Sequence, residues 1–202
     1  MIRARLLLPL VAWLALAAAA SAQFSVPADL QSFWDRYSAA ESADDEDEMD
    51  TVCRRYEQES QDVFFLMLDD LSKKDVSALH SMARTLAWTL DRVNRTERHI
   101  ERVRLVLDME MGDRLRRRRA IEQSLDAIDA AAAAKEDKSG PAWDKVTTEF
   151  ERLVEEFTDL GDREQVINCL SQLALIESDR RRDWERAGYL KRLLAEAETL
   201  SY

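Results

Sequence analysis

The chain has 202 residues, 46% of them hydrophobic, and a formal net charge of −11. This length allows one domain or two small ones with a sizeable core. The negative charge disfavours nucleic acid and anionic membranes as partners, because both are polyanions. With only four glycines and three prolines, and with Ala, Leu, Glu and Arg abundant, the composition predicts an all-α fold.

The first 22 residues have the pattern of a secretory signal peptide. Arg3 and Arg5 form a basic start, residues 6–20 are an apolar run, and a small-x-small cleavage site ends at Ala22. The apolar run is shorter than the roughly 20 residues that cross a membrane, so an uncleaved anchor is the weaker alternative. We expect a secreted or periplasmic mature chain without integral membrane association. It carries 27 basic and 40 acidic residues, a net charge of −13.

An acidic run follows a short first helix that opens at Pro27. Residues 41–48 contain six carboxylates, which raises the possibility of a calcium loop. Calcium loops alternate their ligands around a central glycine, and this run has none. We therefore interpret it as a solvated loop whose carboxylates stabilise the start of the next helix through the helix dipole. That helix is predicted as one amphipathic element over residues 49–71.

A basic run, Arg114 to Arg119 with one leucine, follows further helices from Asp75 and Thr96. The run lies in an acidic chain and has no interleaved aromatic residues on which bases could stack. We interpret it as a solvated helix face, paired to acidic neighbours. Its helix continues into alanines 130–134, which favour helix and allow close helix contact.

The sequence predicts a domain boundary at residues 135–141, where charged residues precede Gly140 and Pro141. An N-terminal helical region would then occupy residues 23–134. The C-terminal region would occupy residues 142–202.

Two apolar stripes flank Gly161 in the C-terminal region. Their members recur every three or four residues and so share one face of each predicted helix. They are Phe150, Leu153, Val154 and Phe157 before the glycine, and Val166, Leu170 and Leu173 after it. Trp184 repeats the aromatic start 34 residues after Phe150, with Gly188 four residues on. This period is typical of stacked helical repeats.

Residues 144–200 resemble a tetratricopeptide repeat followed by a partial second one. Phe150 and Phe157 match the two aromatic positions of the family pattern, Leu153 the leucine and Gly161 the turn. Val154 departs from the pattern, because glycine is usual there. The resemblance implies antiparallel helix hairpins stacked as a right-handed α-solenoid, with about seven helices in the whole chain.

In the resembled family, the first helices of the repeats line a concave binding surface. The corresponding positions here are Thr148, Glu151, Glu155, Thr158, Asp159, Arg182, Glu185, Tyr189 and Arg192. Glu151, Glu155 and Asp159 are spaced by four and therefore share a helix face on spacing alone. We expect a groove for a protein or peptide segment that is basic or neutral. The alternative is a solvated acidic stripe with no ligand.

Cys53 and Cys169 each lie on the apolar stripe of a predicted helix. Two buried free thiols are the favoured interpretation, and a disulfide between them is the alternative in an exported chain. We predict no catalytic, metal or cofactor site, because no nucleophile–histidine arrangement, paired catalytic carboxylates or phosphate loop occurs. The expected function is an exported scaffold for protein–protein interaction. A structural bundle or oligomer, or part of a larger repeat-containing enzyme, remains the alternative.

Overall fold

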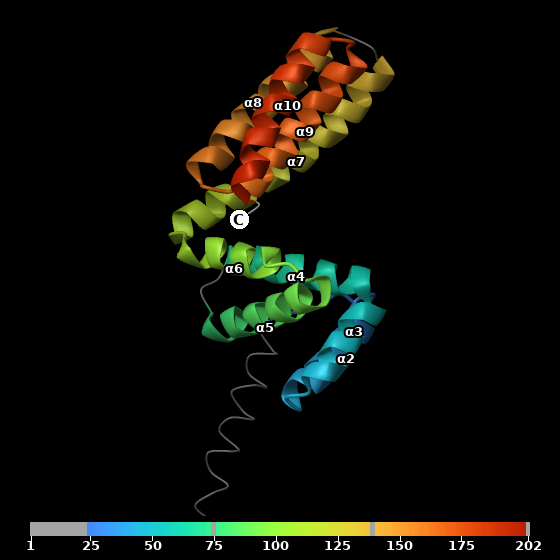
Figure 1. The fold of residues 1–202 in the computed structure, drawn as a ribbon, viewed down its shortest axis with the longest axis vertical. Coiled ribbons are helices and arrows are strands. Elements are labelled where there is room, and N and C mark those ends of the chain that lie inside the picture. Colours follow the sequence, from blue (N-terminus) through green and yellow to red (C-terminus); the bar gives the residue numbers. More distant parts are fainter. Residues whose placement is uncertain (1–23, 74–75, 138–139, 201–202) are drawn as a thin grey trace, which may run out of the picture. The chain divides into compact units, whose positions relative to one another are not determined.

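The computed structural model describes residues 24–73, 76–137 and 140–200 (Figure 1). Within these ranges every regular element is an α-helix, which confirms the all-α prediction. The predicted signal peptide, residues 1–22, lies outside the described residues. The described helices are α2 Gln31–Ser42, α3 Glu46–Arg55, α4 Glu57–Leu71, α5 Ser77–Asn94, α6 Arg98–Asp108, α7 Met111–Asp137, α8 Gly140–Asp159, α9 Arg163–Asp179 and α10 Asp183–Leu200.

The described ranges hold nine helices, against the expected seven or so. One difference lies at Tyr56, where the single helix predicted over residues 49–71 is interrupted. Tyr56 has φ −120° and ψ 55°, outside the helical region, and it separates α3 from α4. Its ring lies 6.3 Å from that of Phe33 and below the guanidinium of Arg36. Both contacts are made with another helix, so the periodicity of residues 49–71 gives no sign of them.

The chain divides into two compact units between Met111 and Gly112. In the first unit, helices α2 to α6 enclose a core rich in aromatic side chains. Phe33 and Tyr37 are fully buried and their rings stack at 5.6 Å. The Tyr37 hydroxyl lies 3.2 Å from that of Thr89, which satisfies the one polar atom that this tyrosine brings into the core.

Asp91 organises the junction between α5 and α6. Its buried carboxylate accepts hydrogen bonds from the backbone N–H groups of His99 and Ile100, at 3.0 and 2.9 Å, at the start of α6. It also accepts from the Thr96 hydroxyl and the His99 Nδ1. The other ring nitrogen of His99 lies 3.1 Å from the Gln61 amide on α4. A single carboxylate thereby ties three helices together.

The second unit consists of α7 to α10, which lie side by side in Figure 1. α9 contacts both α8 and α10 extensively. All seven members of the predicted apolar stripes are buried. α7 contributes a narrow buried seam whose members lie three, four or seven residues apart and so share one face of the helix. The seam consists of Arg114, Arg117, Ala120, Ser124, Ala127 and Ala134.

The two compact units divide at another place than the domain boundary predicted at residues 135–141. α7 continues to Asp137, and α8 begins at Gly140 with Pro141 in its first turn. Proline is favoured in a first turn because the N–H it lacks would have no helical partner there. Lys135 is also anchored, with its ammonium 2.9 Å from the Asp179 carboxylate at the end of α9. The breakers therefore begin a helix within the second unit, and the units divide earlier, after Met111.

Four helix ends share one turn geometry, in which the residue that follows the helix has a left-handed backbone conformation. These residues are Asp44, Arg95 and Arg181, with φ of 54° to 58°, and Gly161, with φ of 69°. After α8, Asp162 N–H donates to the Phe157 carbonyl, and Gly161 N–H donates to that of Thr158. After α9, Arg182 and Arg181 repeat both bonds with Glu177 and Ser178. These pairs form Schellman motifs, which satisfy the last helical carbonyls.

Arg181 occupies the left-handed position that glycine fills in the preceding turn. A left-handed conformation costs a non-glycine residue about 1 kcal/mol, so we expect Arg181→Gly to raise the free energy of unfolding by up to about that amount. Arg181→Ala serves as the control, because it removes the charge and keeps the backbone strain. Urea unfolding followed by circular dichroism measures both variants. Equal stabilisation by alanine and glycine would show that charge, and not strain, is responsible.

Candidate functional site: the outer face of α8 and α10

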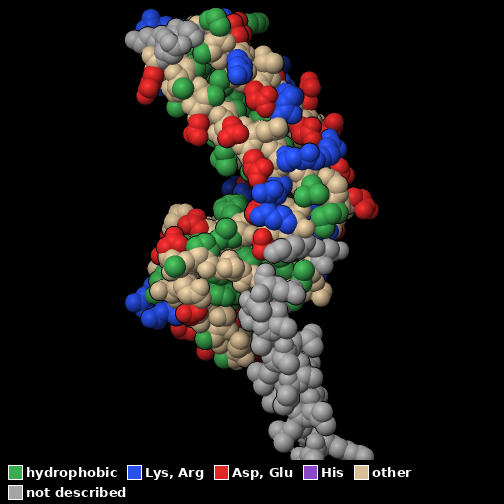
Figure 2. Space-filling view, turned by 180° about the vertical axis from the view of Figure 1, so that it is seen from behind, with side chains coloured by type: hydrophobic (Ala, Val, Ile, Leu, Met, Phe, Trp, Pro, Cys, Tyr) green, Lys and Arg blue, Asp and Glu red, His purple; other side chains and the backbone are tan. Residues whose placement is uncertain are grey.

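The structure places the predicted binding residues on α8 and around α10. The α8 members, Thr148, Glu151, Glu155, Thr158 and Asp159, are all exposed. Around α10, Arg182, Glu185 and Arg192 are exposed and Tyr189 is half-buried. The acidic residues of α8 thus lie at the surface, as their spacing predicts. Acidic and basic side chains also lie interspersed over the face drawn in Figure 2.

Glu151 and Tyr189 are brought together by the fold. The Tyr189 hydroxyl donates a hydrogen bond to the Glu151 carboxylate at 2.7 Å, joining α10 to α8 across 38 residues of sequence. Burial raises the pKa of Tyr189 above its ordinary value, and the hydrogen bond to Glu151 raises it further. Among the predicted residues that the structure describes, this is the pair joined by a hydrogen bond. The others are placed on the surface without such a link to one another.

Other carboxylates of α8 are neutralised by arginines, unlike the three predicted binding carboxylates. Glu149 pairs with Arg152 at 2.7 Å, and this arginine holds the pKa of Glu149 below its ordinary value. Glu156 pairs with Arg116 of α7 at 3.0 Å. Within the described residues, Glu151, Glu155 and Asp159 have no ion pair. One face of α8 therefore keeps an uncompensated negative charge.

A buried ionic cluster at the end of α9 was not predicted from the sequence. Glu177 is only 2% exposed, and one of its oxygens lies 3.3 Å from the Arg180 guanidinium. Arg180 also reaches Asp144 at 2.5 Å and Thr147 at 3.4 Å, both on α8. The spacing of three between Glu177 and Arg180 is a signal for a helical ion pair. Nothing local in the sequence indicates the link to α8.

Trp184 differs from the position that the repeat pattern gives it. Phe150, its counterpart 34 residues earlier, is 1% exposed, whereas Trp184 is 88% exposed. The physical reason lies in α10 as a whole, because none of its described side chains is buried. α10 therefore presents apolar side chains to solvent, including Leu190 and Leu194.

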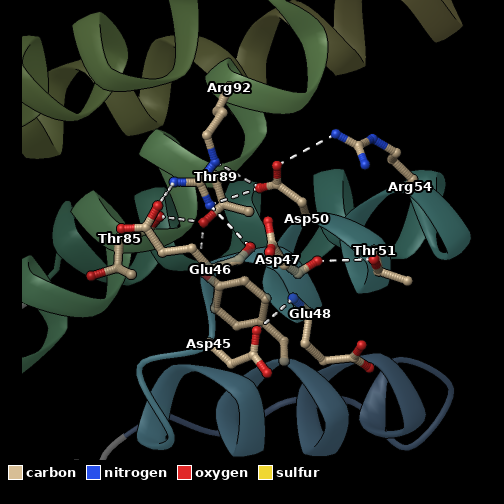
Figure 3. Close-up of polar contacts among 11 residues, drawn as sticks. Asp45, Glu46, Asp47, Glu48, Asp50, Thr51, Arg54, Thr85, Thr89 and Arg92 are labelled. Atoms are coloured by element: carbon tan, nitrogen blue, oxygen red, sulfur yellow. Dashed lines mark hydrogen bonds and ion pairs between the residues drawn. The ribbon is translucent and has the colours of Figure 1, made fainter.

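The acidic segment before α3 acts as a helix cap and an ion-pair partner (Figure 3). Asp45 is the N-cap of α3 and accepts a hydrogen bond from Glu48 N–H at 3.0 Å. Arg92 of α5 contacts the carboxylates of Glu46 and Asp50 at 2.8 and 2.7 Å. The interpretation that these carboxylates stabilise the following helix is confirmed. In the described parts of the chain, no group of three or more metal-ligating side chains is arranged around a common point.

The basic run on α7 is partly buried, which corrects its interpretation as a solvated face. Arg114 and Arg117 are only 6% and 5% exposed. The Arg117 Nε donates to the Asp162 carboxylate at 2.6 Å, and the Asp162 side chain is also buried. Asp162 in turn caps α9 by accepting from Gln165 N–H at 3.3 Å. The pairing with acidic neighbours was correctly predicted, since Arg116 and Arg118 also form ion pairs.

Both cysteines are free and buried, and the favoured prediction is confirmed. Cys53 lies in the first unit and Cys169 in the second. Burial raises the pKa of each thiol to about 12. The thiolate is therefore scarce at neutral pH, and neither side chain is suited to nucleophilic chemistry.

Comparison with known proteins finds no match of any kind: no protein family, no curated protein and no solved structure is significantly similar to the chain. None of the described helices is both long enough and apolar enough to cross a membrane.

Removing Arg117 leaves the Asp162 carboxylate buried without its cation. Loss of one partner from a buried ion pair costs about 3 to 5 kcal/mol, so Arg117→Ala should lower the free energy of unfolding by about 3 kcal/mol. Arg116→Ala is the matched control, because Arg116 is exposed and its removal should change stability little. Urea denaturation compares the two variants. Similar stabilities would mean that the buried pair is not a principal constraint.

The high pKa of both thiols predicts low reactivity in the folded chain. We expect Cys53 and Cys169 to resist iodoacetamide at about pH 8 and to react once urea unfolds the protein. Mass spectrometry of the alkylated chain distinguishes the two sites. Rapid labelling of either cysteine without denaturant would show that its helix opens readily.

Proposed function

We propose that this protein is an exported, tetratricopeptide-like scaffold that binds another protein through the outer face of α8 and α10. The proposal combines the leader at residues 1–22, the 34-residue period and the surface chemistry of α8. Close contacts of α9 with both α8 and α10 are what stacked repeats require. The Tyr189–Glu151 hydrogen bond likewise fits repeats whose first helices are neighbours.

The observation that carries the proposal is the uneven neutralisation of α8. Glu149 and Glu156 have arginine partners, whereas Glu151, Glu155 and Asp159 have no ion pair within the described residues. Three carboxylates spaced by four on one helix face repel one another. A basic peptide segment would relieve this repulsion, and steering by the acidic surface would speed its association.

The Tyr189 side chain gives this face an apolar component as well. Tyrosine combines a broad ring with a hydroxyl, and such side chains are enriched in protein interfaces. Its hydrogen bond holds the Glu151 carboxylate in place, so less conformational entropy is lost when a cation binds there. The face is thus suited to an arginine or lysine side chain flanked by apolar residues.

Reversal of charge on this face tests the proposal. We expect Glu151→Lys combined with Glu155→Lys to reduce capture of the partner from the exported fraction at least tenfold, because the new cations repel a basic segment. Asp129→Lys with Glu136→Lys makes the same change in net charge at exposed positions of α7 and should leave capture intact. Quantitative pull-down with mass spectrometry measures each variant. Equal capture by all three chains would overturn the acidic-groove proposal.

A further inference from the structure

Both ring nitrogens of the buried His99 face oxygen atoms in the first unit. The Nδ1 lies 2.7 Å from the Asp91 carboxylate on α5, and the Nε2 lies 3.1 Å from the amide oxygen of Gln61 on α4. An ionised carboxylate and an amide oxygen only accept hydrogen bonds, so each ring nitrogen must donate one. With Gln61 in this orientation, the His99 ring therefore carries a proton on both nitrogens and is a cation.

Asp91 and Phe64 fix the His99 ring in place. The Asp91 carboxylate also accepts from the Thr96 hydroxyl at 2.8 Å and from the backbone N–H groups of His99 and Ile100 at 3.0 and 2.9 Å. These three further donors stabilise the carboxylate as an anion, so Nδ1 keeps its proton whether or not the ring is charged. The Phe64 ring packs edge-on against the imidazole, with the centroids 5.1 Å apart and the planes at 77°. A change in ring charge therefore concerns Nε2 alone.

Gln61 is the member of this cluster that is free to reorient. It is half-buried, and within the described residues its side-chain amide has no hydrogen-bond partner other than His99. Rotation of the amide by half a turn exchanges its oxygen for its NH₂ group and breaks no other hydrogen bond with the described residues. The NH₂ group then donates to the Nε2 of a neutral ring, which is an acceptor.

We propose that the Gln61 amide is a proton-responsive switch, which turns its oxygen toward His99 when the ring is charged and its nitrogen when the ring is neutral. Histidine is the side chain that ordinarily changes charge between about pH 5 and about pH 8. Among the described residues, Asp91 on α5 is the charged side chain in contact with His99, and the α4 groups that face it, Gln61 and Phe64, do not titrate. The link between α4 and α6 thus survives a change of pH with every hydrogen bond kept. The switch lies in the first unit and is independent of the proposed partner binding.

Nitrogen-15 NMR of the full chain across the titration of His99 tests the proposal directly, and the chain has only two histidines to assign. We expect the His99 Nδ1 to be protonated throughout and the Nε2 to be protonated only on the acid side. A coupling across the hydrogen bond from the Gln61 amide nitrogen to Nε2 should be present only on the basic side. A neutral ring with its proton on Nε2 would overturn the proposal, and so would an amide orientation that does not change with pH.

Substitution of Gln61 should make the stability of the first unit depend on pH in a direction that the new side chain sets. Gln61→Leu leaves the Nε2–H of the charged ring without an acceptor, and a buried unsatisfied donor costs more when it is charged. We expect this variant to lose about tenfold more of its folding equilibrium constant at about pH 5 than at about pH 8. Gln61→Glu should show the opposite dependence, because its carboxylate favours the charged ring and repels the lone pair of the neutral one. Its stability relative to the natural chain therefore falls as the pH rises.

Urea unfolding of the full chain at the two pH values, followed by circular dichroism, measures these variants. Gln58→Leu is the matched control, because Gln58 is an exposed glutamine of the same helix whose amide bonds to Asp62 and not to His99. We expect its stability relative to the natural chain to be the same at both pH values. An equal pH dependence for Gln61→Leu and Gln58→Leu would overturn the switch, as would a shift in the same direction for both Gln61 variants.

Discussion

The ion pair between Arg117 and Asp162 is the constraint on which the second unit depends. The two side chains are buried and their charged atoms lie 2.6 Å apart. Burying either charge alone is expensive, so the position of Asp162 fixes where α7 lies against the turn. The same carboxylate caps α9, and the turn before it is held by Gly161. The start of α9 and the placement of α7 therefore depend on one side chain, and the backbone N–H of the same residue closes the end of α8. In the first unit Asp91 has the same role, because it caps α6 and holds His99.

Local periodicity predicted the parts of the fold that depend on neighbouring residues. The apolar stripes around Gly161 are buried, the glycine turn lies at its predicted place, and both cysteines are buried free thiols. The failures share one cause, which is distance along the chain. Arg117 finds Asp162 45 residues away, and Tyr56 leaves the helical conformation beside Phe33. A single sequence contains no signal for such contacts. A buried arginine therefore cannot be distinguished from a solvated one by sequence alone.

At the candidate site, too, local spacing predicted some features, and others depend on contacts between distant residues. Spacing alone placed Glu151, Glu155 and Asp159 on one exposed face, because that follows from the geometry of a single helix. The neutralisation of Glu149 and Glu156 depends on the register of Arg152 and Arg116, and only the folded structure supplies it. Nor could spacing reveal that Trp184 is exposed while Phe150 is buried. The equivalence of two repeat positions holds only where each repeat is covered by the next helix.

The exposure of α10 explains how one small unit can present two different surfaces. A helix with fully buried side chains on every contact face has little surface left for a partner, whereas no described side chain of α10 is fully buried against its unit. Its half-buried side contributes Tyr189 to the acidic face of α8, and its first turn presents Trp184 between the exposed Asp183 and Glu185. The spacing between Trp184 and Tyr189 is five residues, so these side chains point in different directions from the same helix. Occupation of one surface therefore leaves the chemistry of the other intact.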